Sequence, residues 1–360
     1  MSERRVFLEE FVARAGWGEA DREDIQGDAS TRSYSRLTMG DRKAVLMNAP
    51  KGDEDLGEPE GASVEIRRAL GYNASARLAG PNLEAFLTVA AELSMRGLSA
   101  PHIIAADVDL GFALLEDFGD GDFWRVIHAD PAMERPLYEA AVDVLAVIYR
   151  SSFPSKPSFQ GHTWHIREYD EVALLAETDL FLDFYAPDVG RPVSDVARAE
   201  FYDLWRAAFV CLEAHAPGLC LRDFHAQNLF WLPDRKGQAR IGLIDFQDAL
   251  MAHPAYDLAS FLEDARRDVD PELYEPLKQR FCEKAGLRYD DDFQAAYAVM
   301  AAQRNTKVIG FPVRADVKFG KPQYRSLIPR VRAYLKRDLS HPACAGLRRW
   351  FEINVPEVMQ

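Results

Sequence analysis

Two acidic residues and one amide in the second half of the chain have the types and spacing that phosphoryl transfer requires. Asp223 and Asn228 lie in a loop-like segment with four residues between them, and Asp245 follows a short apolar segment. A hydroxyl that attacks a phosphate needs a carboxylate to orient it and accept its proton. The charge on the phosphate is neutralised by Mg²⁺, which prefers oxygen ligands. We therefore predict that Asp223 is the base and that Asn228 and Asp245 are metal ligands.

An Asp and an Asn at this spacing also occur as caps of turns and helices, and for the loop taken alone that alternative is open. The surrounding sequence favours the catalytic interpretation. Residues 229–232 and 240–244 are short apolar segments typical of strands, and the polar segment 233–237 between them is typical of a hairpin turn. The whole segment also lies beyond the predicted boundary between two lobes, where a ligand cleft is expected.

The elements that must position these residues differ between the two parts of the chain. In the first part, apolar spacing predicts two helices, at residues 4–15 and 82–96. Alternation and short apolar runs predict strands at 33–38, 44–47, 102–108 and 112–116, with a hairpin turn at Gly40. This order favours an antiparallel sheet with a covering helix, and we assign residues 1–118 to a small N-terminal lobe.

Beyond Gly119 the pattern is mainly helical. The predicted helices are 134–150, 167–184, 195–215, 256–267, 271–285, 290–310, 324–338 and 343–353. Strands are expected to recur only at 229–232 and 240–244. We therefore predict an α+β fold of two lobes, in which residues 119–360 form a larger and mostly helical C-terminal lobe.

Composition excludes several classes of protein. The 360 residues carry a formal net charge of −14, which argues against a nucleic-acid binder and against docking on anionic membranes. The first ten residues contain acidic side chains where a signal peptide would be apolar, so we do not expect a signal peptide. No apolar run reaches the length of a membrane span. The four cysteines are widely spaced, as is typical of reduced thiols. We expect a cytoplasmic protein.

The loop and the residues after it resemble the aminoglycoside phosphotransferase and choline kinase group, which are relatives of the protein kinases. Asp223, His225 and Asn228 match the group's H-x-D-x-H-x-x-N pattern, although Leu221 replaces its first His. The segment 256–259 matches the group's D-L-A signature, in which Asp257 would brace the catalytic loop. The resemblance implies a protein-kinase-like fold that uses ATP with Mg²⁺.

The same resemblance extends to the nucleotide site. Residues 27–34 look like the hairpin that covers the phosphates, and residues 114–119 look like the hinge strand that binds adenine. The group usually has a Lys on its third strand, where this chain has Met47. The nucleotide-binding residues implied by the resemblance are Gly27, Asp28, Ala29, Ser30, Met47, Glu116 and Phe118. For Arg32 we favour a solvated charge over a phosphate contact, and for Glu84 and Glu92 surface charges over a partner for the missing Lys.

A narrower resemblance links residues 45–50, 244–249 and 304–310 to bacterial kinases of cell-wall sugars. These phosphorylate the anomeric hydroxyl of N-acetylmuramate and N-acetylglucosamine during peptidoglycan recycling. His225, Gln227 and Asp248 are then candidates for binding sugar hydroxyls. Arg304 and Lys307 lie three residues apart on one predicted helix face, which suits a substrate carboxylate, although a solvated helix face is the alternative.

Two other functions remain open on the sequence. One is a kinase of another small alcohol, of the aminoglycoside, choline or homoserine type. The other is a nucleotide-binding pseudokinase scaffold, which the losses at Met47 and Leu221 would favour. A protein kinase is disfavoured because residues 246–256 are too few for an activation loop. The sequence therefore predicts a small-molecule kinase whose acceptor is a sugar or another alcohol.

Overall fold

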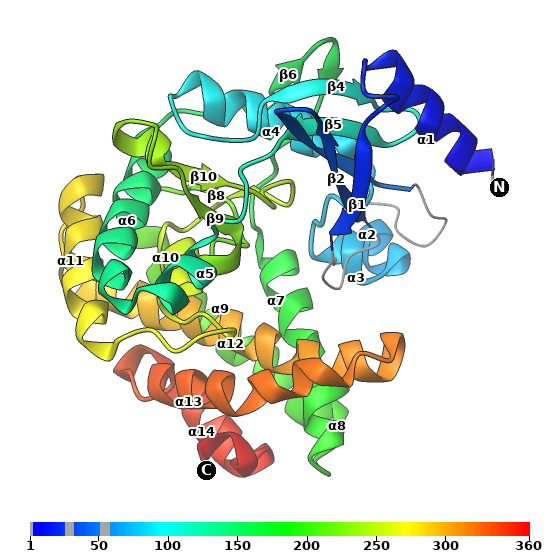
Figure 1. Cartoon of the computed structure of the whole chain (residues 1–360). Coiled ribbons are helices and arrows are strands. Elements are labelled where there is room, and N and C mark those ends of the chain that lie inside the picture. Colours follow the sequence, from blue (N-terminus) through cyan, green and yellow to red (C-terminus); the bar gives the residue numbers. More distant parts are fainter. Residues whose placement is uncertain (1–2, 26–31, 51–57) are drawn as a thin grey trace. The chain divides into compact units, whose positions relative to one another are not determined.

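The computed structural model describes residues 3–25, 32–50 and 58–360 (Figure 1). The chain divides into two compact units, each assembled from separate stretches of sequence. Unit 1 comprises Met1–Pro131, Phe153–Ile166 and Gln227–Ala249, and unit 2 comprises Ala132–Ser152, Arg167–Ala226 and Leu250–Gln360.

Unit 1 contains a five-stranded antiparallel sheet in the order β1-β2-β3-β5-β4. Its strands are β1 (Asp21–Ile25), β2 (Ser33–Met39), β3 (Arg42–Asn48), β4 (Ile103–Asp107) and β5 (Phe112–Glu116). Gly40 has a φ of 61° in the turn between β2 and β3, a conformation that glycine adopts without strain. The hairpin and the pair β4–β5 were predicted. β1 was not, because all five of its residues are exposed and its sequence shows no apolar alternation.

Helix α1 (Glu3–Arg14) covers one face of this sheet. The core between them contains Leu8, Phe11, Val12, Trp17, Leu37, Ala44, Leu46, Phe112 and Leu114. Because side chains alternate along a strand, Val45 and Met47 of β3 face the opposite side of the sheet, as does Tyr34 of β2. Met47 pairs in register with Tyr34 on β2 and with Ala113 on β5. The strand position that usually carries a Lys therefore lies away from the α1 core.

Among its described residues, the rest of unit 1 includes further α-helices and short hairpins. The helices are α2 (Val64–Leu70), α3 (Tyr72–Ser75), α4 (Leu83–Met95) and α5 (Phe123–Ala129). The hairpins are β6 (Ser158–Phe159) with β7 (His162–Thr163), and β9 (Leu229–Trp231) with β10 (Ile241–Leu243). The predicted strands at 229–232 and 240–244 thus form the predicted hairpin. A backbone bridge from Ser99 to Gly242 and another from Asp122 to Phe230 hold it within unit 1.

Unit 2 is mostly helical, as predicted. Its helices are α6 (Glu134–Arg150), α7 (Glu171–Leu180), α8 (Ala186–Asp188), α9 (Asp195–Phe209), α10 (Ala255–Leu262), α11 (Tyr274–Ala285), α12 (Asp291–Phe319), α13 (Ile328–Asp338) and α14 (Ala345–Asn354). One antiparallel pair joins β8 (Gly218–Cys220) to β11 (Leu250–Ala252). The expectation of strands only at 229–232 and 240–244 was therefore wrong. β9 and β10 are equally short but flank a turn-like segment, whereas β8 and β11 are far apart in the sequence and show no hairpin pattern.

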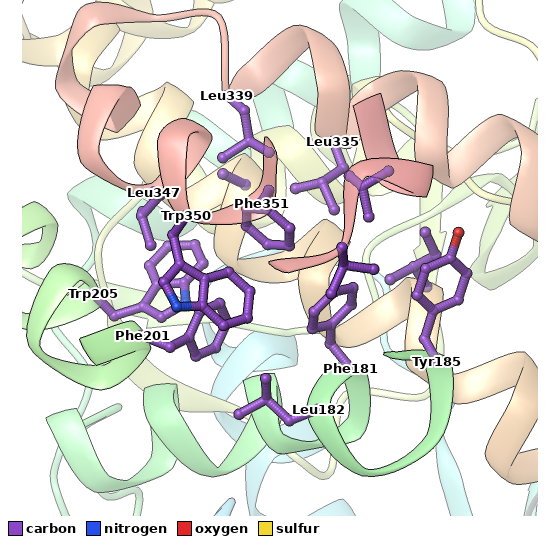
Figure 2. Close-up of a cluster of buried hydrophobic side chains, with 14 of the residues drawn as sticks. Phe181, Leu182, Tyr185, Phe201, Trp205, Leu335, Leu339, Leu347, Trp350 and Phe351 are labelled. Atoms are coloured by element: carbon purple, nitrogen blue, oxygen red, sulfur yellow. The ribbon is translucent and has the colours of Figure 1, made fainter. Parts of the chain in front are cut away.

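An aromatic core holds the helices of unit 2 together (Figure 2). Phe201 and Trp205 of α9 pack against Trp350 and Phe351 of α14, and the ring centroids of Phe201 and Trp350 are 4.5 Å apart. Phe181, in a π-helical turn after α7, joins the same cluster. Large apolar side chains from separate segments of sequence therefore share one interior, which stabilises the packing of these helices.

Helix α12 is longer than the sequence indicated. We expected it to end at residue 310, where Gly310 and then Pro312 interrupt the pattern, but it continues to Phe319. A side chain at position 310 would lie 2.2 Å from the carbonyl oxygen of Leu180. Gly310 is therefore a site of close approach between α12 and the end of α7. None of the helices in the described ranges is long and apolar enough to cross a membrane.

Candidate functional site

The loop that carries Asp223 is held to helix α10 by one carboxylate. In unit 2 this loop follows β8, and Asp257 accepts hydrogen bonds from the backbone N–H groups of Leu221 (2.6 Å) and Arg222 (2.9 Å). The Cys220 thiol donates to the same carboxylate at 3.2 Å. Burial raises the pKa of Asp257 to about 6, although these donors act in the opposite direction. Asp257 therefore fixes the backbone immediately before Asp223.

A second buried contact fixes Arg222 itself. Arg222 has a φ of 69°, which is unusual for a residue with a side chain, and it is buried. Its guanidinium donates to Glu177 of α7, which also pairs with Lys307 of α12 at 2.7 Å and accepts from the Tyr169 hydroxyl. We call Tyr169, Glu177, Arg222 and Lys307 the Glu177 cluster.

The Glu177 cluster is a charged network in a nearly dry environment. Burial alone would raise the pKa of Glu177, but the Lys307 and Arg222 cations lower it to about 2. Glu177 therefore stays ionised and can hold both cations. A strained backbone conformation persists when surrounding contacts enforce it, and the cluster does this for the residue that precedes Asp223.

The other polar residues near this loop have different environments. Asp223 is half-buried, His225 is buried and Gln227 is exposed. Burial, together with the charges of Arg266 and Arg304, lowers the pKa of His225 well below its usual value, so the imidazole is neutral near pH 7. A neutral imidazole can donate one hydrogen bond and accept another.

Arg304 and Lys307 do not form a solvated helix face, which was the alternative to a substrate-binding role. Arg304 is buried, and its guanidinium donates to the carbonyl oxygen of Glu263 at 3.4 Å. The Lys307 side chain is 19% exposed and is paired with Glu177. Both cationic side chains therefore contact groups within unit 2.

In unit 1 the β9–β10 hairpin brings Asn228 and Asp245 together. Asn228 immediately precedes β9, and its carbonyl oxygen accepts a hydrogen bond from the N–H of Ile244 at 3.1 Å. The Asn228 side-chain amide lies 3.5 Å from Oδ2 of Asp245. Asp245 has a φ of 60°, and Gln247 donates to its Oδ1 at 3.0 Å. Backbone and side-chain contacts thus set the direction of the Asp245 carboxylate.

This pair suits a hard cation such as Mg²⁺. Asp245 offers a carboxylate whose side chain is 42% exposed, and a rotated Asn228 amide offers its oxygen beside it. Across the part of the chain that the structure describes, no group of three or more His, Cys, Asp and Glu residues is arranged to hold a metal. A metal at Asp245 would therefore complete its shell with oxygens from water or a bound ligand, as Mg²⁺ commonly does.

Arg32 also contacts Asp245, which the sequence did not suggest. Its side chain is 11% exposed, and Nη1 lies 3.7 Å from Oδ1 of Asp245. Although burial acts to lower the pKa of Arg32, its interactions with Tyr34, Asp245 and Asp248 raise it. The preference for a solvated charge was therefore wrong, because Arg32 lies against the carboxylate of a candidate metal ligand.

The remaining nucleotide candidates are only partly described. Gly27, Asp28, Ala29 and Ser30 lie outside the described residues. Met47 is buried on β3.

Glu116 ends β5, where its carboxylate pairs with Arg235 and its backbone N–H donates to the carbonyl oxygen of His102 at 2.8 Å. That N–H already donates a hydrogen bond within the fold, so an adenine at the hinge strand would need a different hydrogen-bond donor. The guanidinium of Arg235 lies 5.3 Å from the centre of the Phe118 ring, which also packs against Phe230.

Two further acids are engaged in structural contacts. Asp248 accepts a hydrogen bond from the backbone N–H of Ala79 at 2.5 Å, which fixes the segment before α4. Glu92 is buried and pairs with Arg96 at 2.7 Å, one turn later in the same helix, so the expectation of a surface charge was wrong for Glu92. Glu84 is half-buried.

Sequence reasoning missed Glu177, Gln247 and the contact made by Arg32. Glu177 lies 45 residues before Arg222 in an ordinary helical pattern, so nothing local indicated the pair. Gln247 was read as part of a motif, without a role of its own. For Arg32, proximity to a predicted phosphate hairpin was the available signal, and the exposed alternative was preferred.

Comparison with known proteins adds a family and a fold. The sequence profile of the phosphotransferase enzyme family matches residues 21–299. The chain is 40% identical over 355 residues to the N-acetylmuramate/N-acetylglucosamine kinase of Caulobacter vibrioides, covering 99% of this chain and 98% of that protein. It is 29% identical over 343 residues to the enzyme of the same name from Pseudomonas aeruginosa, covering 91% of this chain and 88% of that protein.

A solved structure shows the same fold at low sequence identity. The choline/ethanolamine kinase family protein of Mesorhizobium loti superposes with a TM-score of 0.58 at 14% identity, covering 96% of this chain and 98% of that protein. The predicted fold class, a protein-kinase-like α+β fold with a β-rich N-terminal part and a helical remainder, is confirmed.

Proposed function

The chain belongs to the phosphotransferase enzyme family, and on that basis we propose that it transfers the γ-phosphate of ATP to the anomeric hydroxyl of N-acetylmuramate or N-acetylglucosamine. The observation that carries the proposal is the 40% identity, over 99% of the chain, to a kinase whose name states these two sugars. The proposed setting is cell-wall sugar recycling in the cytoplasm. All four cysteines are free thiols, which suits a reducing compartment.

In this proposal Asp223 orients the sugar hydroxyl and accepts its proton. Two contacts of the preceding residue support the role, since Asp257 and the Glu177 cluster both hold Arg222, immediately before Asp223. Proton acceptance by a positioned carboxylate is effective because the anomeric hydroxyl is more acidic than an ordinary alcohol. Positioning and electrostatic stabilisation would then supply most of the rate enhancement.

Asn228 and Asp245 would hold Mg²⁺, which would bind phosphate oxygens and neutralise the charge that develops on them. Gln247, through its bond to Oδ1 of Asp245, would keep that carboxylate directed toward the metal. The fit rests on the oxygen ligands that the pair offers and on the exposure of the Asp245 carboxylate.

For the nucleotide we retain the assignment implied by the family. Its residues are Gly27, Asp28, Ala29, Ser30, Met47, Glu116 and Phe118. We also retain residues 1–118 as the nucleotide lobe and 119–360 as the lobe of the catalytic loop and the acceptor. Met47 supports this placement because it faces away from the α1 core.

For the sugar, His225 and Gln227 are the strongest candidates in the loop. The neutral His225 imidazole suits a hydroxyl, and the exposed Gln227 amide can donate and accept. Asp248, Arg304 and Lys307 remain proposals of lower priority, because each is engaged in a contact within its own unit. A substrate carboxylate at Lys307 would have to share the ammonium with Glu177.

The experiment follows ADP release from ATP and Mg²⁺ with a panel of acceptors. The panel contains N-acetylmuramate, N-acetylglucosamine, an aminoglycoside, choline and homoserine. We expect release with the two N-acetyl sugars and none above the acceptor-free rate with the others. Release with another alcohol would replace the proposed acceptor. A nucleotide-dependent rise in Tm without turnover on any acceptor would indicate a pseudokinase.

A further inference from the structure

Met47 leaves the sheet face opposite α1 without a fixed cation at the strand position of the usual Lys. The bound nucleotide proposed above carries more negative charge than one Mg²⁺ neutralises, so another positive group is expected near the phosphates. The net charge of −14 does not provide it. The cation must therefore come from a local side chain.

Arg32 is placed to reach the same region of the sheet. It immediately precedes β2, and Tyr34, two residues on, pairs in register with Met47. Alternation along an extended chain puts Arg32 on the face that Tyr34 and Met47 share. A side-chain hydrogen bond between Arg32 and Tyr34 supports this placement. A long Arg side chain from the neighbouring strand can therefore occupy the space that a Lys at position 47 would reach.

The guanidinium is also held at the proposed metal site. Nη1 lies 3.7 Å from Oδ1 of Asp245, and the rest of the side chain is largely buried. The carboxylate compensates for the energetic cost of burying the guanidinium. If another cation binds that carboxylate, the guanidinium loses this compensation and needs another anionic partner. A metal bound to Asp245 would leave the guanidinium facing the phosphates that the same metal binds.

We propose that Arg32 supplies the fixed positive charge for the nucleotide phosphates in place of a lysine at position 47, and that its guanidinium exchanges the Asp245 carboxylate for phosphate oxygens when nucleotide binds. This inference rests on the proposed function, because it requires a nucleotide at unit 1. The planar guanidinium suits the role, since it can donate two parallel hydrogen bonds to a phosphate.

The test measures dissociation constants for ADP and for adenosine by calorimetry, with Mg²⁺ and with EDTA. With Mg²⁺, Arg32→Gln should weaken ADP binding by about tenfold to a hundredfold, as expected for a lost hydrogen bond to a charged group. With EDTA the loss should be smaller, because no metal then takes the Asp245 carboxylate from Arg32. Adenosine binding should stay within about twofold, because adenosine has no phosphate. Arg32→Lys, which keeps the charge, should retain most of the ADP affinity.

Two further variants separate a phosphate contact from a structural role. Arg14→Gln removes a positive charge from an exposed ion pair with Asp107 in the same unit, and it should leave both affinities unchanged. The double variant Arg32→Gln/Met47→Lys should recover part of the ADP affinity, because it moves the cation to the strand.

The outcomes are distinguishable from those of the proposed function. No ADP binding by the unaltered protein would overturn the kinase proposal together with this one. ADP binding that Arg32→Gln does not weaken, or an equal loss of ADP and adenosine binding, would overturn the role of Arg32 alone.

Discussion

At the scale of single residues, Asp223 is the proposed base, and neighbouring residues fix the backbone that positions it. Replacing it by Asn keeps the size of the side chain but removes the proton acceptor. We expect Asp223→Asn to lower kcat by about a hundredfold or more, with the dissociation constant for ATP nearly unchanged. Steady-state kinetics with N-acetylmuramate measure this. Asp203→Asn, at an exposed position of α9, is the matched control. Near-normal kcat in Asp223→Asn would remove the base assignment.

Glu177 gives the second prediction at this scale. Its pKa is lowered from 4.5 to about 2, so the folded state binds this proton less readily than the unfolded state. Its contribution to stability, about 3 kcal/mol, is therefore present above pH 4.5 and is lost as the pH falls toward 2. Glu177→Gln should lack this component of acid sensitivity. It should also be less stable at pH 7 by about 3–5 kcal/mol, because it leaves the buried Arg222 and the partly buried Lys307 without their carboxylate.

Urea denaturation at a series of pH values measures both effects. Glu171→Gln, on the exposed side of the same helix, provides the control and should change neither stability nor its pH dependence noticeably. If Glu177→Gln showed the same loss of stability between pH 4.5 and 2 as the unaltered protein, another group would be responsible.

At the scale of elements, the regular helices and the two main hairpins could be predicted because their segments are long enough to show a periodic pattern of apolar residues. Helix α6 was predicted with the bounds that the structure gives, Glu134–Arg150. The exposed β1 could not be predicted because it shows no apolar alternation. The strands β8 and β11 could not be predicted because each pairs with a segment far away in the sequence. The extension of α12 was missed because Gly310 and Pro312 are usual signals for a helix end.

The close approach at Gly310 makes the third prediction. Gly310→Ala would place a carbon 2.2 Å from the carbonyl oxygen of Leu180, and backbone cannot move as a flexible side chain can. We expect this variant to lose about 1–3 kcal/mol of stability, or more, despite the better helix propensity of Ala. Chemical denaturation compares it with Gly18→Ala, whose nearest neighbour would be at 3.4 Å. Equal stability of Gly310→Ala and the unaltered protein would contradict the packing described for α7 and α12.

At the scale of the whole molecule, sequence motifs indicated the acids of the proposed site but not the charged residues that contact the site and its loop. Asp223, Asn228 and Asp245 stand out because their spacing is read along one short segment. The partners Arg32 and Glu177 come from distant parts of the chain, and folding alone brings them to Asp245 and Arg222. The burial of Glu92, expected to be a surface charge, and of Arg304, for which a solvated helix face was the alternative, was missed for the same reason, since a charged residue in a helical pattern gives no sign of its burial.

The net charge of −14 is compatible with the proposed nucleotide binding, because the proposed metal and local cations would offset the acids of the proposed site. The most direct test is ³¹P NMR of the product formed from ATP, Mg²⁺ and N-acetylmuramate. The account predicts a sugar 1-phosphate, with its phosphorus coupled to the anomeric proton, that Asp223→Asn does not form. Phosphate on a different hydroxyl, or inorganic phosphate in place of a phosphosugar, would contradict the account.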